Sequence, residues 1–158
     1  MNIISIVEND PVNSITGFTT TIYFAGCEHK CKGCFSKNTW DYNQGDSYNV
    51  DQLLEIIKLN NHKNVSLIGG DIFYPKNRLE GIELIKKIKL HTNKKIYVWT
   101  GYLKEQVEKW IDLSLIDYLI EGHFEIDKKD IRLPLRGSSN QRIFCNGVDK
   151  TKEIDSLK

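Results

Sequence analysis

The segment Thr19–Trp40, TTTIYFAGCEHKCKGCFSKNTW, joins a strand pattern to a loop with three cysteines. β-Branched and aromatic residues fill its first part, Thr19–Gly26, and the terminal glycine predicts the end of a short strand. Cys27, Cys31 and Cys34 follow with the spacing C-x3-C-x2-C. Loops at the carboxyl ends of parallel strands carry the active sites of α/β folds. The cysteine loop is therefore the first candidate for a functional site.

Length and charge exclude several classes of protein. The chain has 158 residues and a formal net charge of +1, which is typical of a single domain and gives no electrostatic reason to expect a nucleic-acid partner. The N-terminal segment has no basic leader, and no apolar run approaches the ~20 residues of a membrane span. We therefore expect no membrane partner and a location in the reducing cytoplasm, where clustered cysteines indicate metal or redox chemistry.

Strand and helix patterns alternate along the remainder of the chain. Four further segments have the composition of buried strands: residues 64–71, 94–102, 116–124 and 141–146. Helical spacing of apolar residues precedes the first three of them, in stripes at Val50, Leu53, Leu54 and Ile57, at Ile82, Ile85 and Ile88, and at Leu103, Val107, Trp110 and Ile111. Asn49 is the expected cap of the first helix.

This alternation predicts βαβ units around a parallel sheet. A complete (β/α)8 barrel takes about 250 residues, which is more than this chain provides. We therefore expect an α/β fold in the form of a partial, open β/α barrel, with a single curved and mostly parallel sheet.

Three kinds of metal site are compatible with the cysteine triplet. A structural zinc site needs four protein ligands, so Cys145, His29 or His62 would have to complete it. A fully ligated iron–sulfur cluster also needs four cysteines. A [4Fe–4S] cluster on three thiolates would leave one iron open to a small molecule, as catalytic metal sites do. The alternative to an enzyme is thus a small, non-catalytic zinc-binding module.

The cysteine spacing after an early strand resembles the signature of radical S-adenosylmethionine (SAM) enzymes. The longer string GCEHKCKGCFSKNTW, residues 26–40, is similar to the activating components of anaerobic ribonucleotide reductase. The resemblance continues through GGD (69–71), WTGY (99–102), DYLIEGHF (117–124) and RGSSNQRI (136–143), so it implies a single radical SAM domain over residues 1–158.

The resemblance implies a radical SAM oxidoreductase. A [4Fe–4S] cluster on Cys27, Cys31 and Cys34 would cleave SAM reductively, and the product radical would generate a glycyl radical on the reductase. The implied partners are the large catalytic subunit of anaerobic ribonucleotide reductase and a reduced flavodoxin or ferredoxin as electron donor, with a homodimer left open. An activase of a different glycyl-radical enzyme is a close alternative, although most of those carry extra cluster cysteines.

The strand ends supply the candidates for SAM binding. Gly69 and Gly70 let a ligand approach the backbone, and the Asp71 carboxylate can accept hydrogen bonds from an ammonium group. The position resembles the Gly-Gly-Glu-like motif that holds the amino group of SAM, with a shorter acid here. Thr100 and Gly101 close the next strand on what should be the same rim. Ordinary turns between strands and helices explain all these residues equally well.

Two charged residues complete the predicted SAM site. Glu121 closes the fourth strand and could face the ribose or the methionine carboxylate, or be a plain turn residue. Arg142 could pair with the carboxylate of SAM, because a guanidinium group matches carboxylate geometry.

The residues around the cysteines carry weaker signals. Many radical SAM proteins have an aromatic residue where this chain has Gly33, so Phe35 is either an adenine contact or ordinary packing. Trp40 is the last residue of the stretch that resembles the family, and it is a candidate to support the cysteine loop. His29 is expected to be a solvated loop residue. Cys145 is expected to be a small buried residue of the last strand.

Overall fold

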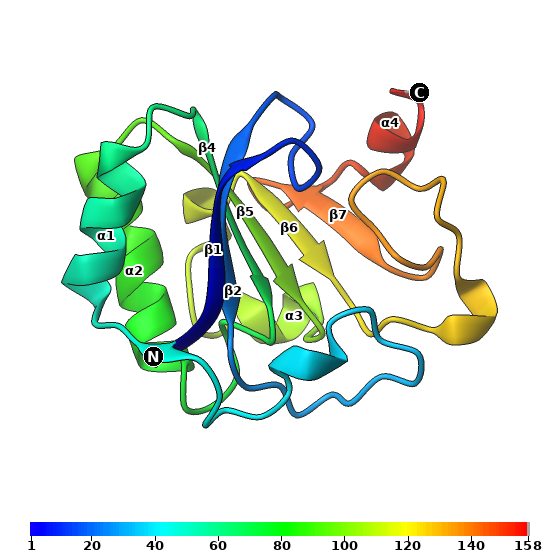
Figure 1. Cartoon of the computed structure of the whole chain (residues 1–158). Coiled ribbons are helices and arrows are strands. Elements are labelled where there is room, and N and C mark those ends of the chain that lie inside the picture. The colour runs from blue at the N-terminus through cyan, green and yellow to red at the C-terminus, as the bar shows by residue number, and fades with distance from the viewer. Residues whose placement is uncertain (158) are drawn as a thin grey trace.

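The computed structural model describes residues 1–157, which form one eight-stranded sheet surrounded by helices (Figure 1). The strands are β1 (Asn2–Asp10), β2 (Thr19–Phe24), β3 (Asp46–Ser47), β4 (Asn64–Gly69), β5 (Lys95–Thr100), β6 (Tyr118–Glu121), β7 (Arg142–Cys145) and β8 (Val148–Asp149). The helices are α1 (Val50–Leu59), α2 (Arg78–His91), α3 (Lys104–Val107) and α4 (Thr151–Asp155), with 3₁₀ turns at Lys37–Thr39, Leu113–Leu115 and Ile126–Lys128.

The sheet is mixed and open. Its strand order is β3-β1-β2-β4-β5-β6-β7-β8. The central pairs β2–β4, β4–β5 and β5–β6 are parallel, as predicted. The four outer pairs are antiparallel, so the prediction of a mostly parallel sheet is wrong. β3 and β8 lie at the two ends of this order and do not pair with each other, so the sheet is open. The barrel-like curvature of the sheet stays a prediction.

The connections explain the antiparallel pairs. A parallel neighbour needs a crossover connection, usually a helix. Residues 122–141, between β6 and β7, contain only one 3₁₀ turn in place of such a helix. β7 therefore returns beside β6 in the opposite direction (Figure 1). β1 is not among the predicted strands, because exposed polar residues interrupt the apolar pattern of this outer strand.

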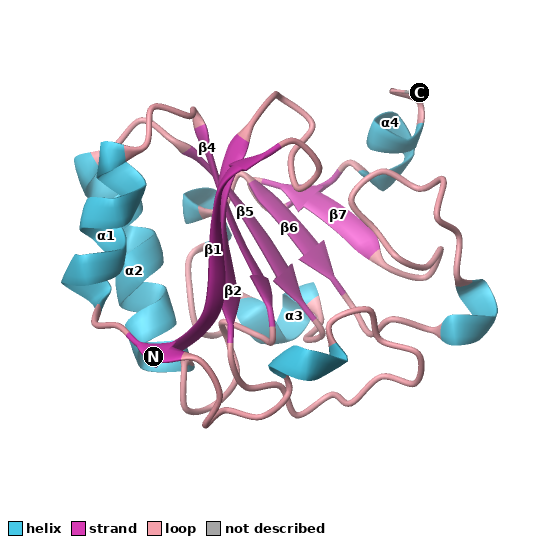
Figure 2. Ribbon diagram, in the orientation of Figure 1, coloured by secondary structure: helices cyan, strands magenta, loops and turns pink. Residues whose placement is uncertain are grey.

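Helices α1 and α2 pack side by side on one face of the sheet (Figure 2). Both are predicted, and Asn49 caps α1 in a capping box: its Oδ1 accepts from the Gln52 N–H at 2.8 Å, and Gln52 Oε1 accepts from the Asn49 N–H at 2.8 Å. The third predicted helix is shorter than its apolar stripe, since α3 ends at Val107. Trp110 is still partly buried, with the Arg78 guanidinium 3.7 Å from its ring centroid. No helix within residues 1–157 is long and apolar enough to cross a bilayer.

The parallel strands end together at one edge of the sheet. In the register, Phe24 lies opposite Gly69 and Thr100 opposite Glu121. The cysteine loop, the Gly-Gly-Asp turn and the turns after β5 and β6 therefore leave the sheet at the same edge, which we call the cysteine edge. Figure 1 shows the 3₁₀ turn of the cysteine loop beyond the tips of these strands.

The connection between β1 and β2, residues 11–18, crosses the opposite end of the sheet. Asn64 at the start of β4 donates from Nδ2 to the Phe18 carbonyl at 3.1 Å, and Ser66 Oγ donates to the Asn13 carbonyl at 2.6 Å. Asp10 holds the same connection by accepting from the Val12 N–H at 2.7 Å. This connection closes the end of the molecule away from the cysteines.

Candidate metal centre and adjoining cavity

The cysteine loop is closed at its base by backbone hydrogen bonds. The Gly26 N–H donates to the Thr39 carbonyl at 2.7 Å, and the Cys27 N–H donates to the Trp40 carbonyl at 3.2 Å. The Asp71 N–H in turn donates to the Gly26 carbonyl at 2.8 Å. The loop is thus fixed both to itself and to the Gly-Gly-Asp turn.

Backbone N–H groups donate hydrogen bonds to the three cysteine sulfurs. Ser36 N donates to Cys34 Sγ at 3.4 Å. Burial raises the pKa of the Cys27 thiol to about 12, although backbone hydrogen bonds from residues 29 and 30 oppose this rise. Burial likewise raises the pKa of Cys31, against a backbone hydrogen bond from Phe124. Such thiols lose their protons when a cation binds, and N–H donors to sulfur are a feature of iron–sulfur sites, so the loop fits a cluster.

Within residues 1–157, no fourth protein ligand is placed beside the triplet. No three His, Cys, Asp or Glu side chains within residues 1–157 are gathered to hold a single metal ion. Cys145 follows Phe144, which lies opposite Leu119, so it belongs to the end of the sheet away from the cysteine edge. His62 lies at that far end too, stacked on Phe18 with ring centroids 5.5 Å apart. Cys145 is half-buried in β7 and is followed by β8, so the expected full burial in a last strand is not met.

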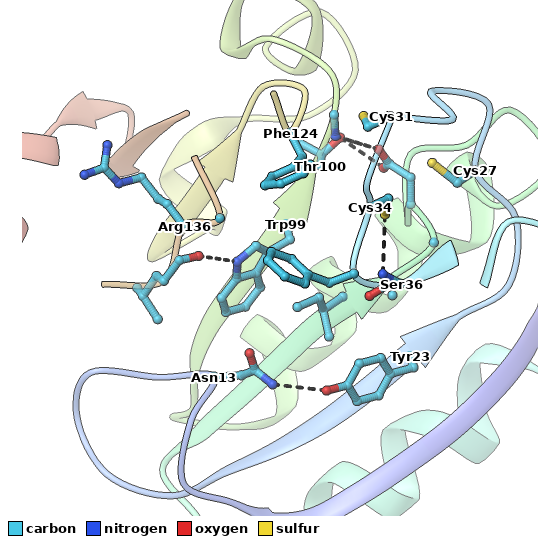
Figure 3. A pocket seen from close by; sticks show the side chains of 18 of the residues that line it. Asn13, Tyr23, Cys27, Cys31, Cys34, Ser36, Trp99, Thr100, Phe124 and Arg136 are labelled. Atoms are coloured by element: carbon cyan, nitrogen blue, oxygen red, sulfur yellow. Dashed lines mark hydrogen bonds between the residues drawn. The ribbon is translucent and has the colours of Figure 1, made fainter. Parts of the chain in front are cut away.

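A cavity of about 710 Å³ adjoins the loop, within the usual size range of ligand pockets. All three cysteines line it (Figure 3). Figure 3 also shows that Asn13 and Tyr23 lie at the end away from the cysteines, with Trp99 between. The cavity therefore runs from the cysteine loop toward the β1–β2 connection.

Asp71 is the centre of a buried hydrogen-bond network on the cavity wall. Its Oδ2 accepts from Thr100 Oγ1 at 2.8 Å and from the Gly101 N–H at 2.9 Å, while Oδ1 accepts from the Phe73 N–H at 2.9 Å. The Asp71 side chain is 1% exposed. It therefore ties the ends of β4 and β5 together.

His29 joins this network, which corrects the expectation of a solvated loop residue. Its side chain is 7% exposed, and Nε2 lies 3.0 Å from Asp71 Oδ2. Nδ1 lies 2.9 Å from Nε2 of His123, which is itself exposed. Tyr102 packs edge-on against the His29 ring at 4.4 Å. Because both its nitrogens are engaged, His29 is not free as a fourth ligand, and its burial depends on contacts with distant residues that the sequence pattern does not reveal.

Comparisons with known proteins agree with this geometry. A protein-family model described as a 4Fe-4S single cluster domain matches residues 16–144. The anaerobic ribonucleoside-triphosphate reductase-activating protein of Pasteurella multocida (strain Pm70) is 36% identical over 154 residues, which cover 91% of this chain and 97% of the relative. The chain belongs to this activating-protein family. Relatives of the same name include those of Enterobacteria phage T4, 33% identical with 92% and 95% covered, and of Escherichia coli (strain K12), 36% identical with 83% and 92% covered.

In this activating-protein family member, most of the predicted SAM residues lie at the cavity. Its lining includes the predicted residues Gly69, Gly70, Asp71, Thr100 and Gly101. Packing alone explains one of the glycines, because a Cβ at Gly70 would lie 2.4 Å from the Gly26 carbonyl oxygen. The cavity thus brings these residues together, and their contact with SAM stays a prediction.

Phe35 and Trp40 line the cavity as well. Phe35 is 64% exposed, with its ring centroid 5.2 Å from that of Phe124. The Trp40 carbonyl accepts from the Cys27 N–H, a backbone contact open to any residue type, so support of the loop by the Trp40 side chain stays a prediction. The adenine contact of Phe35 stays a prediction.

Glu121 and Arg142 are not among the residues that line the cavity. They form a two-pronged ion pair, with Arg142 Nε donating to Glu121 Oε1 at 2.7 Å and Nη2 donating to Oε2 at 3.0 Å. Glu121 Oε2 also accepts from the Lys104 N–H at 2.7 Å. A contact of either side chain with SAM stays a prediction.

Sequence reasoning missed Gln141 and Arg136, which do line the cavity. Gln141 Oε1 accepts from the Gly137 N–H at 3.0 Å, and its Nε2 donates to the Gly122 carbonyl at 3.0 Å. Arg136 donates from Nη1 to the Gln141 carbonyl at 2.8 Å and pairs with Asp155. These contacts join the loop before β7 to the cysteine edge. The sequence signal for them is the family resemblance of the stretch 136–143, which assigns no individual role to either residue.

Proposed function

We propose that this chain is a radical SAM activase that generates a glycyl radical on anaerobic ribonucleoside-triphosphate reductase. The observation that carries the proposal is the cysteine triplet itself. Three cysteines line one cavity, and the other metal-ligating residues considered above are distant or engaged. Membership of the activating-protein family supports the same proposal.

Cys27, Cys31 and Cys34 would hold the [4Fe–4S] cluster. When bound, the cluster supplies the electron that splits SAM into methionine and a 5′-deoxyadenosyl radical, which takes a hydrogen atom from a glycine of the reductase. The protein's own part is placement and exclusion of water. The backbone N–H groups around the sulfurs stabilise thiolates, and the long cavity provides room for SAM beside the cysteines.

The strand-end residues would receive SAM. Both oxygens of Asp71 already accept hydrogen bonds from Thr100, so we propose that Asp71 mainly fixes the shape of the wall to which the amino group of SAM binds. The reductase is the proposed partner, and a reduced flavodoxin or ferredoxin is the proposed electron donor. Activation of a different glycyl-radical enzyme remains the alternative substrate choice.

The test uses the anaerobic protein reconstituted with iron and sulfide. Dithionite and SAM are added, and 5′-deoxyadenosine is measured for wild type, Cys31→Ala and Cys145→Ala. Cys145 is the matched control, because it lies at the far end of the sheet. We expect product from wild type and Cys145→Ala alone, and a glycyl-radical electron paramagnetic resonance signal when the reductase is added.

Two results would count against the proposal. Stoichiometric zinc without iron in the isolated protein, together with no 5′-deoxyadenosine, would favour the zinc module. Product formation without any radical on the reductase, but with a radical on another glycyl-radical enzyme, would favour the alternative substrate.

A further inference from the structure

The segment after β6, residues 122–126, packs along the cysteine loop, and we call it the wall segment. His123 Nε2 lies 2.9 Å from Nδ1 of His29. The Phe124 ring has its centroid 5.2 Å from that of Phe35, and Figure 3 shows Phe124 at the cysteine end of the cavity. The wall segment therefore touches the cysteine loop at positions both before and after the last two cysteines.

The wall segment also reaches one of the predicted cluster ligands. The Phe124 N–H donates a hydrogen bond to the Cys31 sulfur. The packing beside this contact is close, because a Cβ at Gly33 would lie 2.7 Å from Cδ1 of Ile126. Hydrogen bonds to the sulfurs of an iron–sulfur cluster help to set its reduction potential. Reduction adds a negative charge, so an N–H donor at Cys31 favours the reduced form and raises the potential.

Two side chains of the loop before β7 hold the wall segment from its other side, and we call them the frame residues. Asn140 Nδ2 donates to the His123 carbonyl at 2.8 Å. Ser138 Oγ accepts from the Glu125 N–H at 3.1 Å. These contacts fall on the residues immediately before and after Phe124. They therefore fix the stretch of backbone that carries the Phe124 N–H.

The frame residues are placed to act on backbone and not on a ligand. Neither belongs to the described lining of the cavity, whereas the neighbouring Gln141 does. Ser138 is 0% exposed, so a partner protein does not reach its hydroxyl. Asn140 Oδ1 is buried and has no hydrogen-bond partner within residues 1–157, so the amide group is engaged through its Nδ2 contact with the wall segment.

We propose that Ser138 and Asn140 are positioning residues that hold the Phe124 N–H against Cys31 and thereby raise the reduction potential of the cluster. The inference rests on the proposed function, because it requires a cluster on the three cysteines. It deepens that function by giving the loop before β7 a part in the reduction step. The frame residues act through the backbone of the wall segment, as outer contacts of a metal site commonly do.

The test compares two double variants that remove the same side-chain types. Ser138→Ala with Asn140→Ala is the frame variant. Ser139→Ala with Asn93→Ala is the control, because both of these side chains are exposed and make no hydrogen bond among the described residues. Hydrogen–deuterium exchange of the cluster-free proteins is followed by mass spectrometry. We expect the amides of residues 122–126 to exchange about fivefold faster in the frame variant alone, as the loss of about 1 kcal/mol of hydrogen bonding predicts.

The reduction potential gives the second readout. Each protein is reconstituted anaerobically with iron and sulfide, its iron content is measured, and the visible absorption is titrated against potential. We expect the equilibrium constant for one-electron reduction to be up to about tenfold smaller in the frame variant, which corresponds to a potential lower by up to about 59 mV. The control should keep the wild-type potential. A purely structural role of the frame residues would change stability and leave the potential unchanged.

Several outcomes would refute the positioning role. Faster exchange with an unchanged potential would show that the wall segment does not tune the cluster. A lower potential without faster exchange, or an equal shift in the control, would exclude an action through the wall segment. A frame variant that folds but binds no cluster would assign these residues to cluster retention. If the double variant does not fold, Ser138→Ala and Ser139→Ala alone provide the same comparison of two adjacent serines.

The proposed function fails in a different way. Wild type that takes up no iron–sulfur cluster, or that holds one and does not cleave SAM with dithionite, would refute the proposed function. The exchange of residues 122–126 in the cluster-free proteins would still show whether Ser138 and Asn140 hold the wall segment.

Discussion

Replacing Thr100 with valine tests whether the buried network around Asp71 stabilises the cysteine edge. Thr100 lies in β5, and its hydroxyl donates to both oxygens of Asp71, at 3.0 and 2.8 Å. It also accepts from the Tyr102 N–H at 3.2 Å. Valine keeps the shape and the β-branching of threonine, so the strand should be preserved while these hydrogen bonds are lost.

The magnitude follows from the burial of the acceptor. Asp71 is 1% exposed, so water cannot replace the missing donor without a rearrangement. A hydrogen bond to a charged group contributes about 1.5–3 kcal/mol. We therefore expect Thr100→Val to lower the free energy of unfolding by about 2 kcal/mol. In a domain of this size the melting temperature should fall by about 4–8 °C.

Thr20 in β2 provides the matched control. Its side chain is fully buried, and its hydroxyl has no hydrogen-bond partner among the described residues. Thr20→Val removes an unsatisfied polar group, so its effect should be neutral or stabilising. Urea unfolding of the cluster-free protein measures both variants. Equal destabilisation by Thr100→Val and Thr20→Val would refute the reasoning, because then the loss of a hydroxyl would matter regardless of its partners.

Three further substitutions have defined outcomes. Gly101→Ala should lower the free energy of unfolding in urea by about 1–3 kcal/mol, because the new Cβ would lie 2.3 Å from Cδ2 of His29. If the variant is as stable as wild type, the His29 ring moves freely and this reasoning is wrong. Arg142→Ala should cost about 3 kcal/mol, since it leaves the buried Glu121 carboxylate without its cation, and a loss of SAM affinity without a loss of stability would instead favour a direct contact. Asn49→Ala should lower the free energy of unfolding by about 1 kcal/mol by removing the cap of α1, and an unchanged thermal midpoint would contradict that role.

Local patterns predicted much of the chain correctly. The strand from Thr19, the strands β4 to β7 and the helices α1 and α2 follow from apolar periodicity, because each buries one face or one stripe. The cap at Asn49 also follows from local sequence, since its two hydrogen bonds span three residues. α3 is the exception. The helix ends at Val107, and the remaining residues of the predicted apolar stripe, Trp110 and Ile111, lie beyond its end.

Strand direction and pairing could not be predicted in the same way. Alternation of strands and helices correctly predicts the three parallel pairs, but β1 and β7 are joined to their neighbours by connections without a crossover helix. Both pair in the antiparallel direction. A periodic pattern reports which residues are buried, and it does not report which way a neighbouring strand runs.

Local sequence is enough to predict the spacing of the cysteine triplet, the central strands and the family resemblance, because these depend on residues close together in the chain. The side chains that surround the triplet depend instead on how the sheet brings distant segments together. The tertiary structure placed His29 between Asp71 and His123 and paired Glu121 with Arg142. Each of these contacts joins segments brought together only by the sheet, so it depends on the whole fold.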